Sequence, residues 1–133
     1  MSVADWEAGP DLDVEVARRV FGEEIGAYDT DAGPRQFIKS FGLSRDVPPY
    51  SSEIAAAWTV VERLRDDGFL VRVQEHPESF RHDFEERLAW RARRAMCLME
   101  RVTLGVHQRA GIGYADTAAL AICRAALEAR SST

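Results

Sequence analysis

The stretch Ser51–Gln74 constrains the fold most, because it contains the signals of a helix, a glycine and a strand in direct succession. Ser51 or Ser52 suits the cap of the helix. The apolar side chains that recur at helical spacing predict a buried stripe, and they are Ile54, Ala57, Trp58, Val61 and Leu64. Gly68 suits the left-handed position that ends a helix, and the alternating run Phe69–Gln74 predicts a strand. Such a unit is typical of a layered fold that combines helices with a sheet.

Two further helices are predicted near the ends of the chain. The segment Asp11–Phe21 has apolar side chains on one helical face and charged side chains on the other, and Gly22 suits its exit. The segment Asp116–Arg130 is rich in alanine, and Asp116 or Thr117 suits its cap.

Two long segments between these elements leave alternatives open. The periodicity disappears over residues 23–49, which predicts either a loop with a short strand near Phe37 or a functional flap. Over residues 78–101 helical spacing is favoured, although alternation across part of the segment keeps a strand open. Residues 102–106 alternate and predict a second strand, and Gly111-Ile112-Gly113 predicts a turn.

A chain of 133 residues suits one domain. We expect residues 1–133 to form a single α/β domain of the α+β kind, a small three-layer helix–sheet–helix sandwich with a short, mostly antiparallel sheet. Residues 1–10 are expected as an N-terminal arm, in which Trp6 needs a surface such as a neighbouring subunit on which to dock. Residues 79–101 are the place of a possible inserted helix.

Three segments carry a resemblance to a known family, and they are Trp6–Asp13, Pro48–Ser51 leading into Ile54–Trp58, and Ala115–Leu127. In this order they resemble the phage ABA sandwich domain family, which consists of small proteins of phages and prophages. The resemblance implies a sheet between helical layers and a setting in phage or mobile-element biology. It implies no activity and no catalytic residues. The chain departs from the family over residues 79–101, where typical members are shorter.

The net charge and the composition limit which partners and which cellular location we expect. The net charge of −5 and the absence of a reader motif disfavour binding to duplex nucleic acid. The sequence has no apolar run long enough for a membrane span and no export signal at its start. Cys97 and Cys123 lie among apolar residues and are expected as reduced core thiols. We therefore expect a cytoplasmic protein, in the host cytoplasm if it is encoded by a phage.

The sequence gives little support for catalysis or metal binding. His76 and His82 are six residues apart, His107 is distant, and no cysteine has a partner at ligand spacing. A base such as His107 could meet an acid across neighbouring strands, but no nucleophile is indicated beside it. We expect no catalytic residue, no metal and no cofactor, and hence no enzyme.

Anion binding has the better physical case. Helix N-termini offer N–H groups to anions, here near Tyr50 and Thr117, although ordinary capping explains both places. Residues 81–109 hold seven arginines against four acids, whereas residues 1–50 hold ten acids against five bases. Arginine suits phosphate and base recognition, and the alternative is a solvated face paired with the acidic half of the chain. The candidate ligand-binding residues are Tyr50, Ser51, Ser52, Arg72, Arg91, Arg94, His107 and Thr117.

Two functions from different classes follow. The first is a non-catalytic phage or prophage accessory protein that binds a small anionic ligand and sequesters a host nucleotide immune signal, as a homo-oligomer. The alternative is a protein-interaction or regulatory module that acts on a host or phage protein without a small ligand. A small nucleotide-processing enzyme comes third.

Overall fold

A computed structural model describes residues 6–40, 42–75 and 94–131. In chain order, the elements of the described residues are α1 (Pro10–Arg19), β1 (Glu24–Thr30), β2 (Gly33–Ser40), β3 (Leu43–Asp46), α2 (Ile54–Asp66), β4 (Phe69–Glu75), β5 (Ala95–Thr103), β6 (Val106–Ala115) and α3 (Ala118–Ser131). The helix near the start, the helix–glycine–strand unit and the C-terminal helix are all confirmed.

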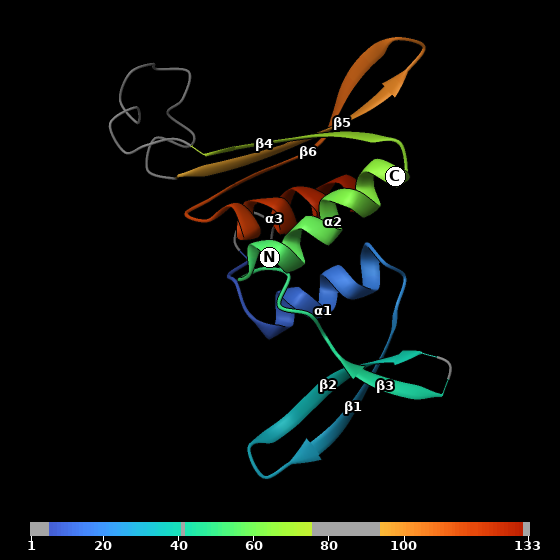
Figure 1. Ribbon diagram of the computed structural model, residues 1–133, viewed down its shortest axis with the longest axis vertical. Helices are drawn as coiled ribbons and strands as arrows, with labels where there is room; N and C mark the ends of the chain where they lie inside the picture. The colour runs from blue at the N-terminus through green and yellow to red at the C-terminus, as the bar shows by residue number, and fades with distance from the viewer. Residues whose placement is uncertain (1–5, 41, 76–93, 132–133) are drawn as a thin grey trace.

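The strands form two antiparallel sheets, ordered β1-β2-β3 and β4-β5-β6. The three helices lie between the sheets, with α2 and α3 next to β4-β5-β6 and α1 nearer to β1-β2-β3 (Figure 1). The expected α+β class and the antiparallel pairing are confirmed, and the strands are divided between two sheets on opposite sides of the helices.

Helix α3 and strand β6 approach each other closely because two glycines leave space. A Cβ atom on Gly113 would lie 2.2 Å from the Ala121 carbonyl oxygen, and one on Gly111 would lie 2.2 Å from that of Ala125. Both glycines belong to β6, so the turn predicted at Gly111-Ile112-Gly113 is wrong. The alanines of α3 complete the contact, and its alanine-rich sequence therefore serves close packing between a helix and a sheet.

The core lies between β4-β5-β6 and the helices. Its largest fully buried apolar side chains come from all three helices, from β2 and from β5, and they are Leu12, Val16, Ile38, Val60, Val61, Leu64, Cys97, Met99, Ile122, Cys123 and Leu127. The expectation that Trp58 is core is wrong, because its side chain is 40% exposed and the Arg65 guanidinium lies over its ring at 5.6 Å from the centroid. Ile54 of the predicted stripe is also exposed.

The stretch between α1 and α2 contains three strands, where the sequence predicted at most one short strand. In β1, β2 and β3, Gly26 and Ile38 are the buried residues. A sheet that is largely exposed on both faces needs little alternation of apolar and polar side chains, so the period of two that identifies a strand is weak here.

The helix favoured over residues 78–101 is wrong from Ala95 onward, where β5 begins; residues 76–93 lie outside the described residues. The start of β5 is apolar on both faces, so it has no alternation by which to recognise it. The strand predicted over residues 102–106 is in fact the end of β5, a turn at Leu104 and Gly105, and the start of β6.

Among the described residues, no helix combines the length and the apolar character that crossing a bilayer requires.

Candidate functional site

A groove of about 470 Å³ lies at the edge strand β4 and extends from the end of α2 to the outer face of the β4-β5-β6 sheet. Its lining consists of Arg65, Phe69, Leu70, Val71, Arg72, Glu100 and His107. Two of the predicted ligand-binding residues, Arg72 and His107, are therefore brought to one place from strands that are far apart in the sequence.

Strand alternation positions these side chains. In β4, Phe69 and Val71 pack toward the core, whereas Leu70 and Arg72 point to the opposite face. Leu70 pairs with Glu100 of β5. His107 of β6 belongs to the same outer face, because its partner Val102 is two residues beyond Glu100. The tight turn at Gly68 then brings the last turn of α2, with Arg65, beside the start of β4.

The groove is mainly cationic over an apolar floor. Its lining holds two arginines, Arg65 and Arg72, and one acid, Glu100, whose Oε1 lies 3.9 Å from His107 Nδ1. Leu70 supplies the floor and is 48% exposed. Guanidinium groups bind phosphate and carboxylate oxygens with paired hydrogen bonds, so the chemistry of the groove favours an anion with an apolar part.

The remaining candidates lie elsewhere. Ser51 is fully buried near α1, where its backbone N–H and its Oγ–H both donate to Asp13 Oδ1, at 2.7 and 2.6 Å. The Gly9 N–H donates to Ser51 Oγ at 2.9 Å. The cap of α2 is Glu53 and uses no side-chain hydrogen bond, so the capping role expected for Ser51 or Ser52 is wrong. The Asp13 carboxylate therefore already accepts the two hydrogen bonds that Ser51 could otherwise donate to an external anion.

Tyr50 and Thr117 also have structural partners. Tyr50 is buried and stacks on Phe21 with ring centroids 5.3 Å apart, and its burial raises the pKa of its hydroxyl to about 12. Thr117 Oγ1 accepts the Leu120 N–H at 3.3 Å, which confirms its role as a cap of α3.

Of the predicted arginine pair, Arg91 and Arg94, the described Arg94 lies away from the groove. Arg94 precedes β5 at the end where Ala95 pairs with Glu75, whereas the groove lies at the other end of β4. Arg91 lies outside the described residues. The sequence reasoning missed Arg65, because it gave most weight to the arginine-rich residues 81–109. The signal that could have found Arg65 is Gly68, which places the last turn of a helix beside the first residues of a strand.

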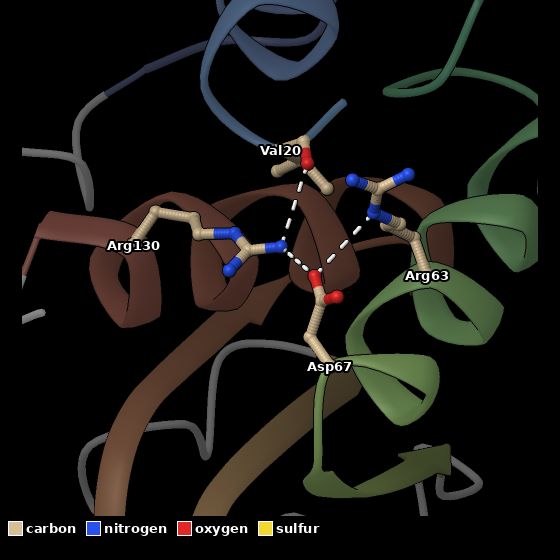
Figure 2. Close-up of polar contacts among 4 residues, drawn as sticks. All are labelled: Val20, Arg63, Asp67 and Arg130. Carbon is tan, nitrogen blue, oxygen red and sulfur yellow. Dashed lines mark hydrogen bonds and ion pairs between the residues drawn. The ribbon is translucent and has the colours of Figure 1, made fainter. Parts of the chain in front are cut away.

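A polar junction supports the wall of the groove behind Phe69. Arg130 of α3 donates hydrogen bonds to Asp67 Oδ2 and to the Val20 carbonyl, and Arg63 Nε lies 3.4 Å from the same Asp67 oxygen (Figure 2). The hydrogen bond from Arg130 is the main reason that the pKa of Asp67 is lowered. The junction thereby joins the C-terminal ends of α1, α2 and α3.

Two guanidinium groups lie near the ring of Phe69. The Arg101 guanidinium lies 5.1 Å and that of Arg130 lies 5.9 Å from the centroid of its ring. Such cation–π contacts fix an aromatic ring without a hydrogen bond. The wall of the groove is therefore set by the helix junction.

Both thiols are remote from solvent. Cys97 and Cys123 are fully buried, and burial raises the pKa of Cys97 to about 12 and that of Cys123 further still. Among the described residues, no group of three His, Cys, Asp or Glu side chains is arranged to hold a metal ion.

A second groove, of about 530 Å³, is formed by the N-terminal arm and the start of α1. It is lined mainly by apolar residues, with two acids, and its members are Trp6, Glu7, Ala8, Gly9, Pro10, Asp11 and Leu12. Arg124, buried in α3, holds the arm by donating from Nε and Nη2 to the Trp6 carbonyl oxygen at 3.0 and 2.7 Å. Trp6 is partly buried against the core of its own chain.

Comparison with known proteins adds a likeness in fold. No family model matches the chain, and no curated protein matches it, so its place in the phage ABA sandwich domain family stays a prediction. Among solved structures, the chain is similar to the crystal structure of a phage protein from Bacillus cereus, with a TM-score of 0.60 and 24% sequence identity over 94% of each chain. At this identity the likeness shows that the two chains share a fold.

Proposed function

We propose that this protein binds a small anionic ligand without catalysis, in the groove lined by Arg65, Arg72 and His107. One observation carries the proposal: an arginine of β4, an arginine of α2 and a histidine of β6 line one groove together with apolar side chains. The groove volume of about 470 Å³ falls within the range of small-molecule sites, roughly 300–1,000 Å³.

The chemistry of the groove fits a nucleotide. The phosphate would accept hydrogen bonds from Arg65 and Arg72, and Leu70 offers an apolar surface to the base or ribose. Glu100 would repel a phosphate placed beside it, so the anionic part belongs at the arginine end and a neutral, hydrogen-bonding part belongs near Glu100 and His107.

The likeness to phage proteins suggests a biological role for this binding. A solved structure with the same fold is called a phage protein, and three segments of the chain resemble a family of phage proteins. A small cytoplasmic protein that sequesters a nucleotide signal of host immunity would protect a phage without any turnover of that signal.

The experiment is a thermal melt of the full chain against cyclic and linear nucleotides, with inorganic phosphate as a reference. A ligand that binds the folded state raises Tm progressively with its concentration. We expect Arg72→Ala to abolish the shift for the nucleotide that stabilises the parent protein. The matched control is Arg35→Ala, which removes an exposed arginine from the other sheet and should leave the shift intact.

Two outcomes would overturn this proposal. If no nucleotide in the panel shifts Tm up to millimolar concentration, the groove does not serve this class of ligand. If the protein converts a nucleotide that stabilises it, the protein is an enzyme. Chromatography of the nucleotides after incubation distinguishes binding from turnover.

A protein-interaction module is the second candidate, and a specific observation favours it. Tyr28 of β1 and Phe37 of β2 form a ring pair with centroids 5.5 Å apart on the exposed β1-β2-β3 sheet. Exposed aromatic residues on a surface are common at protein interfaces. A host or phage protein captured by the parent chain, and lost on Tyr28→Ala, would support this second function.

A further inference from the structure

The hairpin that joins β5 to β6 ends in an apolar tip. Val102, Leu104 and Val106 are all exposed, and Leu104 is 99% exposed. The ladder between β4 and β5 ends at the pair of Phe69 and Arg101, so the hairpin continues beyond the sheet as two strands alone (Figure 1). We call residues 102–106 the hairpin tip.

The backbone at the hairpin tip is unfavourable for leucine. Leu104 has φ 53° and the next residue, Gly105, has φ 79°. Two positive φ values in a two-residue loop are typical of a type I′ turn, in which Asn, Asp or Gly is preferred at the first position. The Leu104 side chain is not buried in its own chain, and its left-handed backbone conformation is energetically unfavourable for leucine. Strain of this kind at an exposed apolar residue points to a role in binding.

The groove of the N-terminal arm is complementary to the hairpin tip. Its lining is mainly apolar, and its acids are Glu7 and Asp11. The strands just behind the hairpin tip carry two arginines, Arg101 and Arg109, beside the single acid Glu100. Apolar surfaces and opposite charges would therefore meet if the hairpin tip entered this groove.

One molecule cannot make this contact with itself. The hairpin tip projects from the far end of the β4-β5-β6 sheet, whereas the groove lies at the start of α1 on the other side of α2 and α3 (Figure 1). We propose that the hairpin tip of one chain docks into the N-terminal-arm groove of a second copy of the same chain.

The contact so formed is head-to-tail, because it joins two different surfaces of the same protein. Contacts of this kind close into a ring when the rotation between copies permits, and otherwise extend into a chain. A five-residue hairpin tip makes a small interface, so the association should be weak and should depend on concentration.

The first test is sedimentation of the parent protein over micromolar to millimolar concentrations, beside two variants. Leu104→Asn removes the apolar side chain and supplies a residue that suits the turn, so it should abolish association and raise Tm by a few degrees. The matched control is Leu43→Asn, which removes another highly exposed leucine from the β2–β3 hairpin and should leave association unchanged. A parent protein that stays monomeric throughout, or an assembly that persists in Leu104→Asn, would overturn the proposal.

The second test identifies the acceptor surface. Ala8→Arg fills the N-terminal-arm groove and adds a positive charge to it, so this variant alone should also be monomeric. A mixture of Leu104→Asn with Ala8→Arg should form a one-to-one dimer, because the first retains an intact groove and the second an intact hairpin tip. A mixture that stays monomeric would show that the hairpin tip does not dock into this groove.

Discussion

Arg130 at the end of α3 donates a hydrogen bond to the carboxylate of Asp67 at the end of α2. The same guanidinium also donates to the carbonyl of Val20 at the end of α1. One cation of α3 therefore lies at the C-terminal ends of α1 and α2, where the helix dipoles are negative.

The Asp67–Arg130 pair should make stability depend on pH in the acid range. The folded-state pKa of Asp67 is lowered, so its contribution is complete above the unfolded pKa near 3.8 and is lost as the pH falls through the folded value. We expect Asp67→Asn to lower the free energy of unfolding by about 1 kcal/mol at pH 7. Urea unfolding at pH 7 and at low pH checks this, because the difference between variant and parent should shrink under acid. An equal difference at both pH values would contradict it.

Adding a single methyl group at the contact between α3 and β6 should destabilise the protein. A Cβ atom on Gly113 would meet a backbone carbonyl oxygen at 2.2 Å, and a backbone cannot withdraw as a flexible side chain can. We expect Gly113→Ala to cost about 2–3 kcal/mol of stability, measured by denaturant unfolding. Gln108→Ala, at an exposed position of the same strand, is the control and should change stability by less than about 0.5 kcal/mol. A stable Gly113→Ala variant would show that α3 is free to move away from the sheet.

Ser51 should contribute to stability far more than its neighbour Ser52. Ser51→Ala removes the hydroxyl that donates to the buried Asp13 carboxylate, and the loss of a hydrogen bond to a buried charge costs about 1–3 kcal/mol. Ser52 is exposed, so Ser52→Ala should change stability by less than about 0.5 kcal/mol. Thermal unfolding of the two variants side by side measures the difference, and equal midpoints would argue against the Ser51–Asp13 contact.

The two cysteines should be inert in the folded protein. Burial raises the pKa of Cys97 to about 12, so the reactive thiolate is scarce at pH 8. An aromatic disulfide reagent should label neither thiol under native conditions and both thiols in denaturant. Rapid native labelling would show that β5 separates from α3 on the timescale of the reaction.

The sequence predicted those helices and strands that bury one face and expose the other. The core faces of α1 and β4 repeat at the expected spacing, and the boundaries of α3 follow from its cap at Thr117. The predictions failed where an element is not clearly divided into one buried face and one exposed face. The start of β5 is apolar on both faces, the β1-β2-β3 sheet is mostly exposed, and Trp58 lies in the apolar stripe of α2 but is covered by a guanidinium rather than by the core.

The candidate site was predictable only in part. Arg72 and His107 were recognised by residue type, but the register that brings them to one face depends on a hairpin turn that local pattern did not show. Ser51 was misread for a related reason. Its partner, Asp13, is 38 residues away in the sequence, and only the packing of α1 against the start of α2 makes them neighbours.

The β1-β2-β3 sheet contributes little to the core beyond Ile38. Its strands can therefore exchange nearly every outward side chain without disturbing the packing of α2 and α3 on the other sheet. A lineage carrying this fold has in residues 24–46 a surface on which new recognition can evolve quickly, while the stability of the molecule is maintained elsewhere.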